Sequence, residues 1–80
     1  MKLTVQLFGI AREIAGHSVL TLAAPAGETA AGLLATLRAT YPGLTELRSL
    51  AVAVNNEYAT ADVALAEGDE IALIPPVAGG

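Results

Sequence analysis

The chain contains no cysteine, one histidine and four cationic residues, and each shortage excludes a class of function. Without cysteine, neither disulfides nor thiolate-bound metals can stabilise the fold, so the core of this 80-residue chain has to be hydrophobic. The same absence excludes a cysteine nucleophile. His17 alone cannot form a histidine-based metal cluster, and in an extended segment Ser18 would point to the opposite face. The sequence therefore predicts a chain that holds no metal and no Ser–His pair.

Charge and hydropathy also limit the partners. The net charge is −4, and no basic stripe is present to follow phosphates, because the cations are spread along the chain as Lys2, Arg12, Arg38 and Arg48. The longest uncharged stretch, residues 14–27, is broken by glycine, histidine and proline and is not a credible membrane span. Charged residues at positions 12 and 13 interrupt what would be the apolar part of a signal peptide. We expect a cytoplasmic domain that binds neither nucleic acid nor membrane.

Apolar periodicity predicts the strands of a small domain. Residues 2–7 alternate polar and apolar side chains, as in a strand with one buried face, and Phe8 continues this run inward or to an edge. Residues 9–18 are expected to form a loop with a helical turn. Strands are expected at four further places: residues 19–22, 51–54, 57–59 and 70–74. The last of these is nearly all apolar, which suits a central strand buried on both faces.

One amphipathic helix is expected to cover this sheet. Thr29 can cap it, Pro42-Gly43 ends it, and its apolar residues recur at helical spacing as Ala30, Leu33, Leu34, Leu37 and Tyr41. With the last strand paired to the first, the result is an α+β fold with a mixed sheet of four to five strands under one main helix. This is the β-grasp, or ubiquitin-like, order. The predicted domain spans residues 1–76, and residues 77–80 form an extended C-terminal tail.

Other motifs inside the domain predict structure and not chemistry. The glycines of residues 27–32 have the spacing of a phosphate-binding loop, but Leu33-Leu34 stand where its Lys and Ser/Thr should be. This segment is therefore interpreted as a helix start. The charged pairs Arg12-Glu13 and Asp69-Glu70 are assigned to the surface. Tyr41 and Tyr58 are assigned to the edges of the core. No catalytic apparatus is predicted within the domain.

The C-terminal sequence carries the clearest chemical signal. An apolar run, residues 71–74, leads into Pro75-Pro76 and then into Val77-Ala78-Gly79-Gly80. The prolines favour an extended path, and glycine lacks the Cβ that would clash in a narrow channel. The residues after Pro76 can reach roughly 13 Å, enough to place a terminal carboxylate in the active site of another protein. The alternative is a frayed end without function, since terminal residues are commonly disordered.

Three segments resemble the small subunits of molybdopterin synthases, a family of ubiquitin-like sulfur carriers. They are residues 7–16 (LFGIAREIAG), residues 53–58 (AVNNEY) and residues 65–80 (LAEGDEIALIPPVAGG). The most specific part of the pattern is the last segment, which joins Gly-Asp-Glu, a short apolar run and Pro-Pro-Val-x-Gly-Gly. The resemblance spans the whole chain.

The resemblance implies that this chain donates sulfur while other proteins supply the catalysis. A ubiquitin-activating-like adenylyltransferase would adenylate Gly80 with ATP, and sulfur from a donor protein would then give a thiocarboxylate. The large synthase subunit would transfer this sulfur to the cyclic pyranopterin monophosphate precursor of the molybdenum cofactor. The resemblance also implies a heterotetramer, in which two small subunits flank a large-subunit dimer, and a chain that binds no cofactor itself. The residues expected to contact the partner are Pro75, Pro76, Val77, Ala78 and Gly79.

Other functions fit the same ending. A carrier of the thiamine pathway would also end in Gly-Gly but resembles the Pro-Pro-Val approach less well, and carriers for cysteine synthesis or tRNA thiolation are further alternatives. A ubiquitin-like protein modifier would use the same carboxylate. Because Lys2 is the only lysine, the sequence disfavours polymeric chains of a modifier but not single attachments. A plain interaction module with an inert end is the remaining alternative.

Overall fold

The computed structural model describes residues 1–47 and 49–75. Within these ranges the chain forms five strands, two α-helices and one 3₁₀ helix, in the order β1 (Lys2–Leu7), α1 (Gly9–Ala15), β2 (Val19–Ala23), α2 (Ala30–Thr40), η1 (Pro42–Glu46), β3 (Ala51–Val54), β4 (Glu57–Tyr58) and β5 (Ile71–Ile74). The predicted strands and main helix are confirmed. The predicted domain boundary after residue 76 and the C-terminal tail lie outside the described residues. No helix in the described part is long and apolar enough to cross a membrane.

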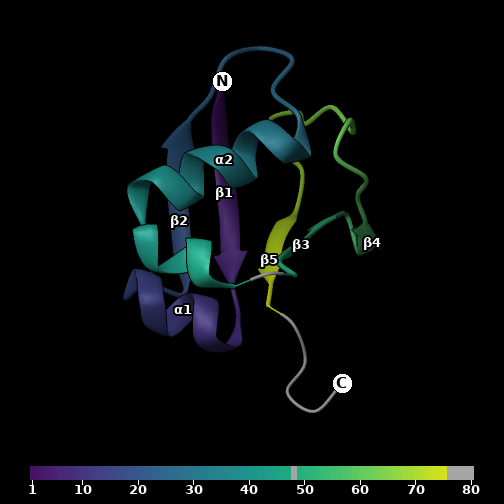
Figure 1. Cartoon of the computed structure of the whole chain (residues 1–80). Coiled ribbons are helices and arrows are strands. Elements are labelled where there is room, and N and C mark those ends of the chain that lie inside the picture. The colour runs from purple at the N-terminus through teal and green to yellow at the C-terminus, as the bar shows by residue number, and fades with distance from the viewer. Residues whose placement is uncertain (48, 76–80) are drawn as a thin grey trace.

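The strands form one mixed sheet in the order β2-β1-β5-β3-β4. The central strand β5 pairs in parallel with β1 and antiparallel with β3, so the predicted pairing of the last strand with the first is confirmed. α2 crosses one face of the sheet, and α1 lies at the end of the sheet where β1 and β5 finish (Figure 1). This arrangement is the β-grasp, ubiquitin-like fold that the sequence predicted.

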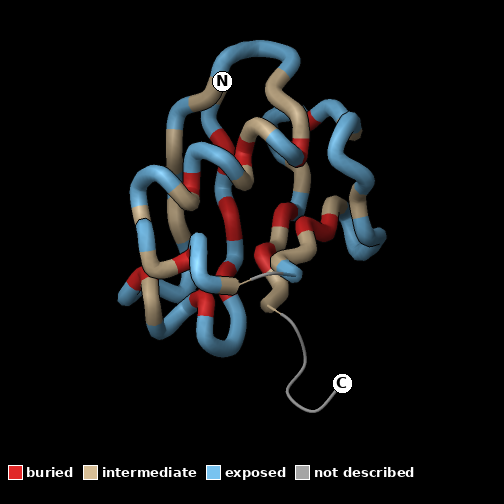
Figure 2. Tube along the Cα trace, viewed as in Figure 1, coloured by how far each residue is buried: buried red, intermediate tan, exposed pale blue. Residues whose placement is uncertain are grey.

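The core lies between α2 and the sheet, because the apolar stripe of the helix faces the apolar side of the strands (Figure 2). Alternation in β1 buries every second residue and leaves the residues between them exposed. Burial of one such leucine, valine or isoleucine side chain contributes about 1.5–3 kcal/mol. The largest fully buried side chains are Leu3, Val5, Leu33, Leu44, Ile71 and Leu73. Apolar packing thus takes the place of the disulfides that this chain cannot form.

Residues 27–32 lead into α2 and form its first turn. Thr29 is the N-cap, as predicted, and its Oγ1 accepts a hydrogen bond from the Gly32 N–H at 3.1 Å. The Glu28 carboxylate accepts from the Thr29 N–H at 3.0 Å and lies where a Cβ on residue 32 would collide with it. The interpretation of this segment as a helix start is therefore confirmed, with Gly32 in the first turn of α2.

Two expectations about burial are wrong. β5 is not buried on both faces: Ile71 and Leu73 are buried, whereas Ala72 and Ile74 are only half-buried, because a single helix layer covers the sheet. Tyr58 is not a core edge, since 73 % of its surface is exposed in the edge strand β4. Tyr41, by contrast, packs against the core as expected.

The segment after β1 is more helical than predicted. Residues 9–15 form a complete short helix, closed by Gly16, whose left-handed φ of 78° lets its N–H donate to the Arg12 carbonyl. Phe8 is the N-cap residue of this helix and is 47 % exposed, so it continues the strand to an edge and not inward. The 3₁₀ helix η1, which follows α2 and buries Leu44, was not predicted.

Candidate partner-binding face

β5 leads the chain to one end of the sheet, where Pro75 is the last described residue. The strand is held by β1 on one side and β3 on the other, and the Phe8 N–H donates a hydrogen bond to the Leu73 carbonyl at 3.4 Å. Pro75 is half-buried and lies next to Gly9. The other residues predicted to bind a partner or carry sulfur lie outside the described residues: Pro76, Val77, Ala78, Gly79 and Gly80. The structure therefore fixes the point from which the predicted tail departs.

We call the face of the sheet opposite α2 the open face. Residues that pair directly across strands point to the same side, so each set of partners forms a row on one face. The middle row of the open face crosses four strands and consists of Gln6, Ala72, Ala53 and Tyr58. Its two central members are alanines, whose short side chains leave a depression in the middle of the row.

A hollow of about 310 Å³, which we call the trough, lies over this row. Ala53 and Ala72 form its floor, and Tyr58 stands on the side of the sheet edge. Gln6, Phe8 and Ile74 contribute to the lining from the side of β1 and the end of β5. Asn56, Glu70 and Ile71 complete the lining, and the first two make one end of it polar. The trough thus combines an apolar floor, aromatic side chains and a polar end.

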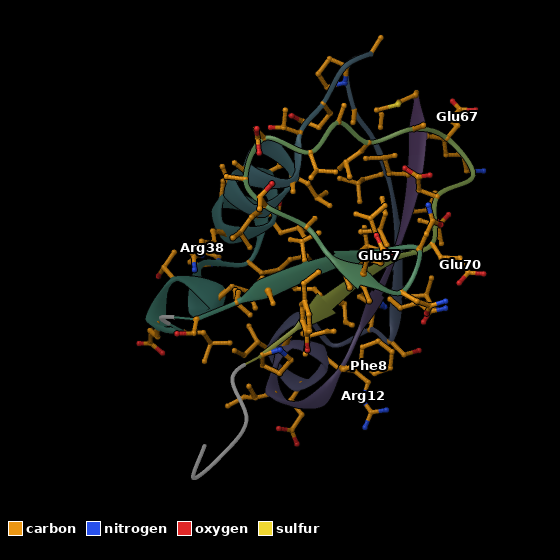
Figure 3. The ribbon with its side chains drawn as sticks, turned by 90° about the vertical axis from the view of Figure 1, so that its right-hand side faces the viewer. Phe8, Arg12, Arg38, Glu57, Glu67 and Glu70 are labelled. Carbon is orange, nitrogen blue, oxygen red and sulfur yellow. The ribbon has the colours of Figure 1, made fainter. Side chains whose placement is uncertain are left out.

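The open face changes from apolar to polar along the strands. Phe8 and Ile74 lie at the end near Pro75, and Phe8 is 47 % exposed. Thr4 and Glu70 lie at the far end and are exposed. Figure 3 shows Phe8 and Glu70 on the side of the sheet away from α2. The apolar end is the part of this face that adjoins the departure point of the C-terminal segment.

Two acidic side chains at turns make local hydrogen bonds. Asp69 accepts hydrogen bonds from the Asn55 side-chain amide at 3.1 Å and from the Ala66 N–H at 2.8 Å, which fixes the turn before β5. A hydrogen bond from the Thr60 hydroxyl lowers the pKa of the exposed Asp62 carboxyl. His17 is exposed between α1 and β2, as expected of a turn histidine.

Candidate metal ligands are also dispersed. Across residues 1–47 and 49–75, no group of three histidine, cysteine or acidic side chains is placed to hold a metal ion.

The trough was not predicted from the sequence, whereas the apolar end of this face has a signal in the sequence. A hydrophobic area beside the C-terminal segment follows from the apolar strand that leads into Pro75. The trough instead depends on the register that brings Gln6, Ala72 and Ala53 into one row from three separate strands. The exposed aromatic Tyr58 after the Asn55-Asn56 turn was the available signal, because exposed aromatic side chains are enriched at binding surfaces.

Comparison with solved structures confirms the class of the fold. SAMP1 from Haloferax volcanii superimposes with a TM-score of 0.85 at 29% sequence identity, covering 100% of both chains. A protein–protein complex of subunits 1 and 2 of molybdopterin-converting factor from Helicobacter pylori matches with a TM-score of 0.67 at 29% identity, again over 100% of both chains. The chain is thus a ubiquitin-like β-grasp protein.

Sequence comparison then gives the family. The profile of the ThiS family matches residues 5–80, and the chain belongs to that family. A molybdopterin synthase sulfur carrier subunit from Arabidopsis thaliana is 42% identical over 81 residues, which cover 100% of this chain and 84% of the relative.

Proposed function

We propose that this chain is the sulfur carrier subunit of a molybdopterin synthase and that Gly80 carries the sulfur as a thiocarboxylate. The observation that carries the proposal is the direct continuation of the central strand β5 into the C-terminal segment at Pro75. A reacting terminus benefits from such a base, because catalysis requires reacting atoms to be placed accurately. Similarity to a sulfur carrier subunit over the full length of this chain supports the same function.

The chemistry begins at the carboxylate of Gly80. With a pKa of about 3.3–3.7, a terminal carboxylate is ionised at neutral pH and is a poor electrophile. An adenylyltransferase joins it to the AMP part of ATP and releases pyrophosphate, and sulfur that a donor protein delivers at the oxidation state of sulfide then displaces AMP. The resulting thiocarboxylate donates its sulfur to the cyclic pyranopterin monophosphate precursor, and water restores the carboxylate. This chain contributes the sulfur-bearing terminus, and the partner enzymes supply ATP binding and the catalytic side chains.

In this proposal the open face docks on the partner while the C-terminal segment enters it. Exposed apolar side chains beside a functional segment commonly mark a protein-binding site. Phe8 meets this description, because it is exposed and precedes Gly9, which lies against Pro75. The half-buried Ile74 adds apolar surface at the same end of the open face. The same face would serve the large subunit and the adenylyltransferase in turn, since both need access to residues 75–80. Because the two enzymes would compete for this face, a loaded carrier would have to leave the adenylyltransferase before it binds the large subunit.

Reconstitution tests the proposal. The chain alone should neither bind nor hydrolyse ATP, whereas addition of the cognate adenylyltransferase, ATP and sulfur donor should raise the intact mass by the exchange of one oxygen for sulfur. A variant lacking Gly80 is the control and should gain no sulfur. Two equivalents of the loaded carrier, each donating one sulfur, and the large subunit should then convert the precursor to a dithiolene product. A carrier that acquires no thiocarboxylate under these conditions would exclude the proposed role.

A protein modifier is the second candidate. The similarity to SAMP1, a small archaeal modifier protein, favours it. A modifier transfers its activated carboxyl group to a lysine amine, so Gly80 would be recovered from cells in an isopeptide bond. Intact-mass and peptide analysis of the C-terminus from cells separates the two functions: a thiocarboxylate indicates the carrier, and a branched lysine peptide indicates the modifier.

A further inference from the structure

The trough on the open face has a chemistry of its own. Its floor is apolar, formed by Ala53 and Ala72, and Tyr58 and Phe8 add aromatic surface. Its polar end presents the carboxylate of Glu70. A site with an apolar floor and a carboxylate at one end fits a long side chain that is apolar along its stem and positively charged at its tip.

We propose that the trough receives an arginine or lysine side chain of the protein that docks on the open face. The identity of that protein rests on the proposed function, in which it is the large subunit. The stem of the basic side chain lies on Ala53 and Ala72, and its cationic group reaches Glu70. Aromatic rings attract cations over their faces, so Tyr58 adds to the selectivity for a positive charge.

The backbone of Glu70 is held in place beside the trough. Its N–H donates to Asn55 Oδ1 at 3.0 Å, and its carbonyl accepts from the Asn55 N–H at 2.8 Å. Both hydrogen bonds use the backbone of Glu70, and the residue remains exposed. Alternation along the strand places it on the same face as Ala72 and Ile74. The backbone is thus fixed at Asn55 while the carboxylate faces solvent beside the trough.

Other occupants fit less well. A partner carboxylate would be repelled by Glu70 and by the net charge of −4 on this chain. A purely apolar side chain would desolvate Glu70, Gln6 and Asn56 without giving them hydrogen-bond partners, which is unfavourable. A basic side chain can both pack its apolar stem on the floor and place a positive charge at the polar end.

The sheet edge provides a matched control for Glu70. Glu57 in β4 pairs with Val54 of β3, which pairs with Ile71 of β5, so Glu57 belongs to a row on the α2 side. Glu57 is exposed and does not line the trough. Glu70→Gln and Glu57→Gln therefore remove the same charge on opposite faces of the sheet. An effect of net charge alone would be equal in the two variants.

The first experiment tests the trough without any partner. Backbone amide NMR of the full chain is followed during titration with N-acetyl-arginine amide and, in parallel, with the neutral isostere N-acetyl-citrulline amide. Arginine should shift the amides of Gln6, Ala53 and Ala72 more than citrulline does, and Glu70→Gln, but not Glu57→Gln, should abolish the difference. Equal shifts with both probes, or an unchanged preference in Glu70→Gln, would overturn the proposal.

The second experiment measures affinity for the cognate large subunit by calorimetry. Glu70→Gln should weaken binding by about tenfold, the lower end of the effect of losing one hydrogen bond to a charged group. Glu57→Gln should stay within about twofold of wild type, a change of less than about 0.5 kcal/mol. Equal weakening by both variants would refute the trough contact. If the wild-type chain fails to bind the large subunit at all, the proposed function is refuted. The arginine titration then remains the test of whether the trough binds a basic side chain.

Discussion

Gly9 lies against Pro75, at the point where the described chain leaves the domain. A Cβ built on Gly9 would stand 3.1 Å from Cγ of Pro75, and Gly9 has a left-handed φ of 54°. L-residues adopt this conformation only at a cost of about 1–2 kcal/mol. Gly9 begins α1 and Pro75 follows β5, so their contact joins the N-terminal helix to the base of the C-terminal segment. Because Gly9 has no side chain, Pro75 can pack directly against its backbone.

We expect Gly9→Ala to impair sulfur transfer by displacing Pro75. A shift of about 1 Å in a reacting group can cost about a hundredfold in rate, so a shift of a few tenths of an ångström should cost several-fold. Gly16→Ala is the matched control, because Gly16 also has a positive φ but has no atom within 4 Å of the built Cβ. Thermal unfolding and single-turnover transfer from a pre-formed thiocarboxylate are compared for both variants.

The two variants separate strain from positioning. Both should lose stability through the left-handed φ, but only Gly9→Ala should lose transfer, and Gly9→Ala/Pro75→Ala should recover part of the transfer rate. Equal rates in Gly9→Ala and Gly16→Ala would show that the contact with Pro75 does not guide the C-terminal segment.

Phe8 should contribute to docking on the large subunit. Replacing this exposed side chain by aspartate places a charge at the apolar end of the open face, and we expect affinity to fall by at least about tenfold, as for an aromatic residue that becomes buried in an interface. Ile10→Asp is the control, because Ile10 is also 47 % exposed but belongs to α1. Binding is measured by calorimetry after thermal unfolding has confirmed that both variants are folded. A larger loss with Ile10→Asp would move the interface from the open face to α1.

The core prediction concerns the apolar stripe of α2. Leu33 is 1% exposed, so Leu33→Ala should destabilise the domain by about 2–5 kcal/mol. An 80-residue domain has a total stability of roughly 4–12 kcal/mol, so this variant should be close to unfolding. Leu34→Ala, at a half-buried position of the same helix, should cost less. Urea unfolding compares the two, and equal losses would contradict the assignment of Leu33 to the centre of the core.

Local patterns in the sequence predicted most of the fold. The strict alternation of residues 2–7 predicts a strand with one buried face, and the Thr29 cap followed by a leucine stripe predicts an amphipathic helix. The structure confirms both. Residues 9–15 were harder, because the helix is a short one and begins at a glycine with positive φ. The burial of β5 could not be judged from its composition. An apolar run does not indicate whether the sheet is covered on one face or on both. Ala72 is compatible with a buried and with a partly exposed position.

The candidate site divides in the same way. The apolar end near Pro75 could be inferred from the chain itself, because an apolar strand runs straight into the diproline. The trough could not, because it requires three strands in a defined register and an alanine in each of two neighbouring strands. Such a surface is a product of tertiary structure, and one strand taken alone carries no sign of it.

Gly79→Val tests whether the C-terminal segment must pass through a narrow channel. Position 79 follows β5 in the sequence and lies outside the described residues. The hydrophobic core is formed by residues of the described part of the chain. Substitutions away from the core usually change stability by no more than about 0.5 kcal/mol, so the melting temperature should hardly move. If the partner encloses the segment closely, however, a valine side chain would clash or restrict φ. We therefore expect a folded variant that transfers sulfur slowly, by on the order of a hundredfold.

The measurement for Gly79→Val is single-turnover transfer from a pre-formed thiocarboxylate, because this bypasses adenylation and isolates the encounter with the large subunit. Ala78→Val provides the control, since it adds two methyl groups one residue earlier at a position that already carries a Cβ. A normal rate for Gly79→Val would mean that the partner leaves room for a side chain at this position. A large fall in melting temperature would instead place residue 79 in the folded domain. Slow transfer by both variants would extend the narrow channel to position 78, whereas slow transfer by Gly79→Val alone would confine it to the final glycines.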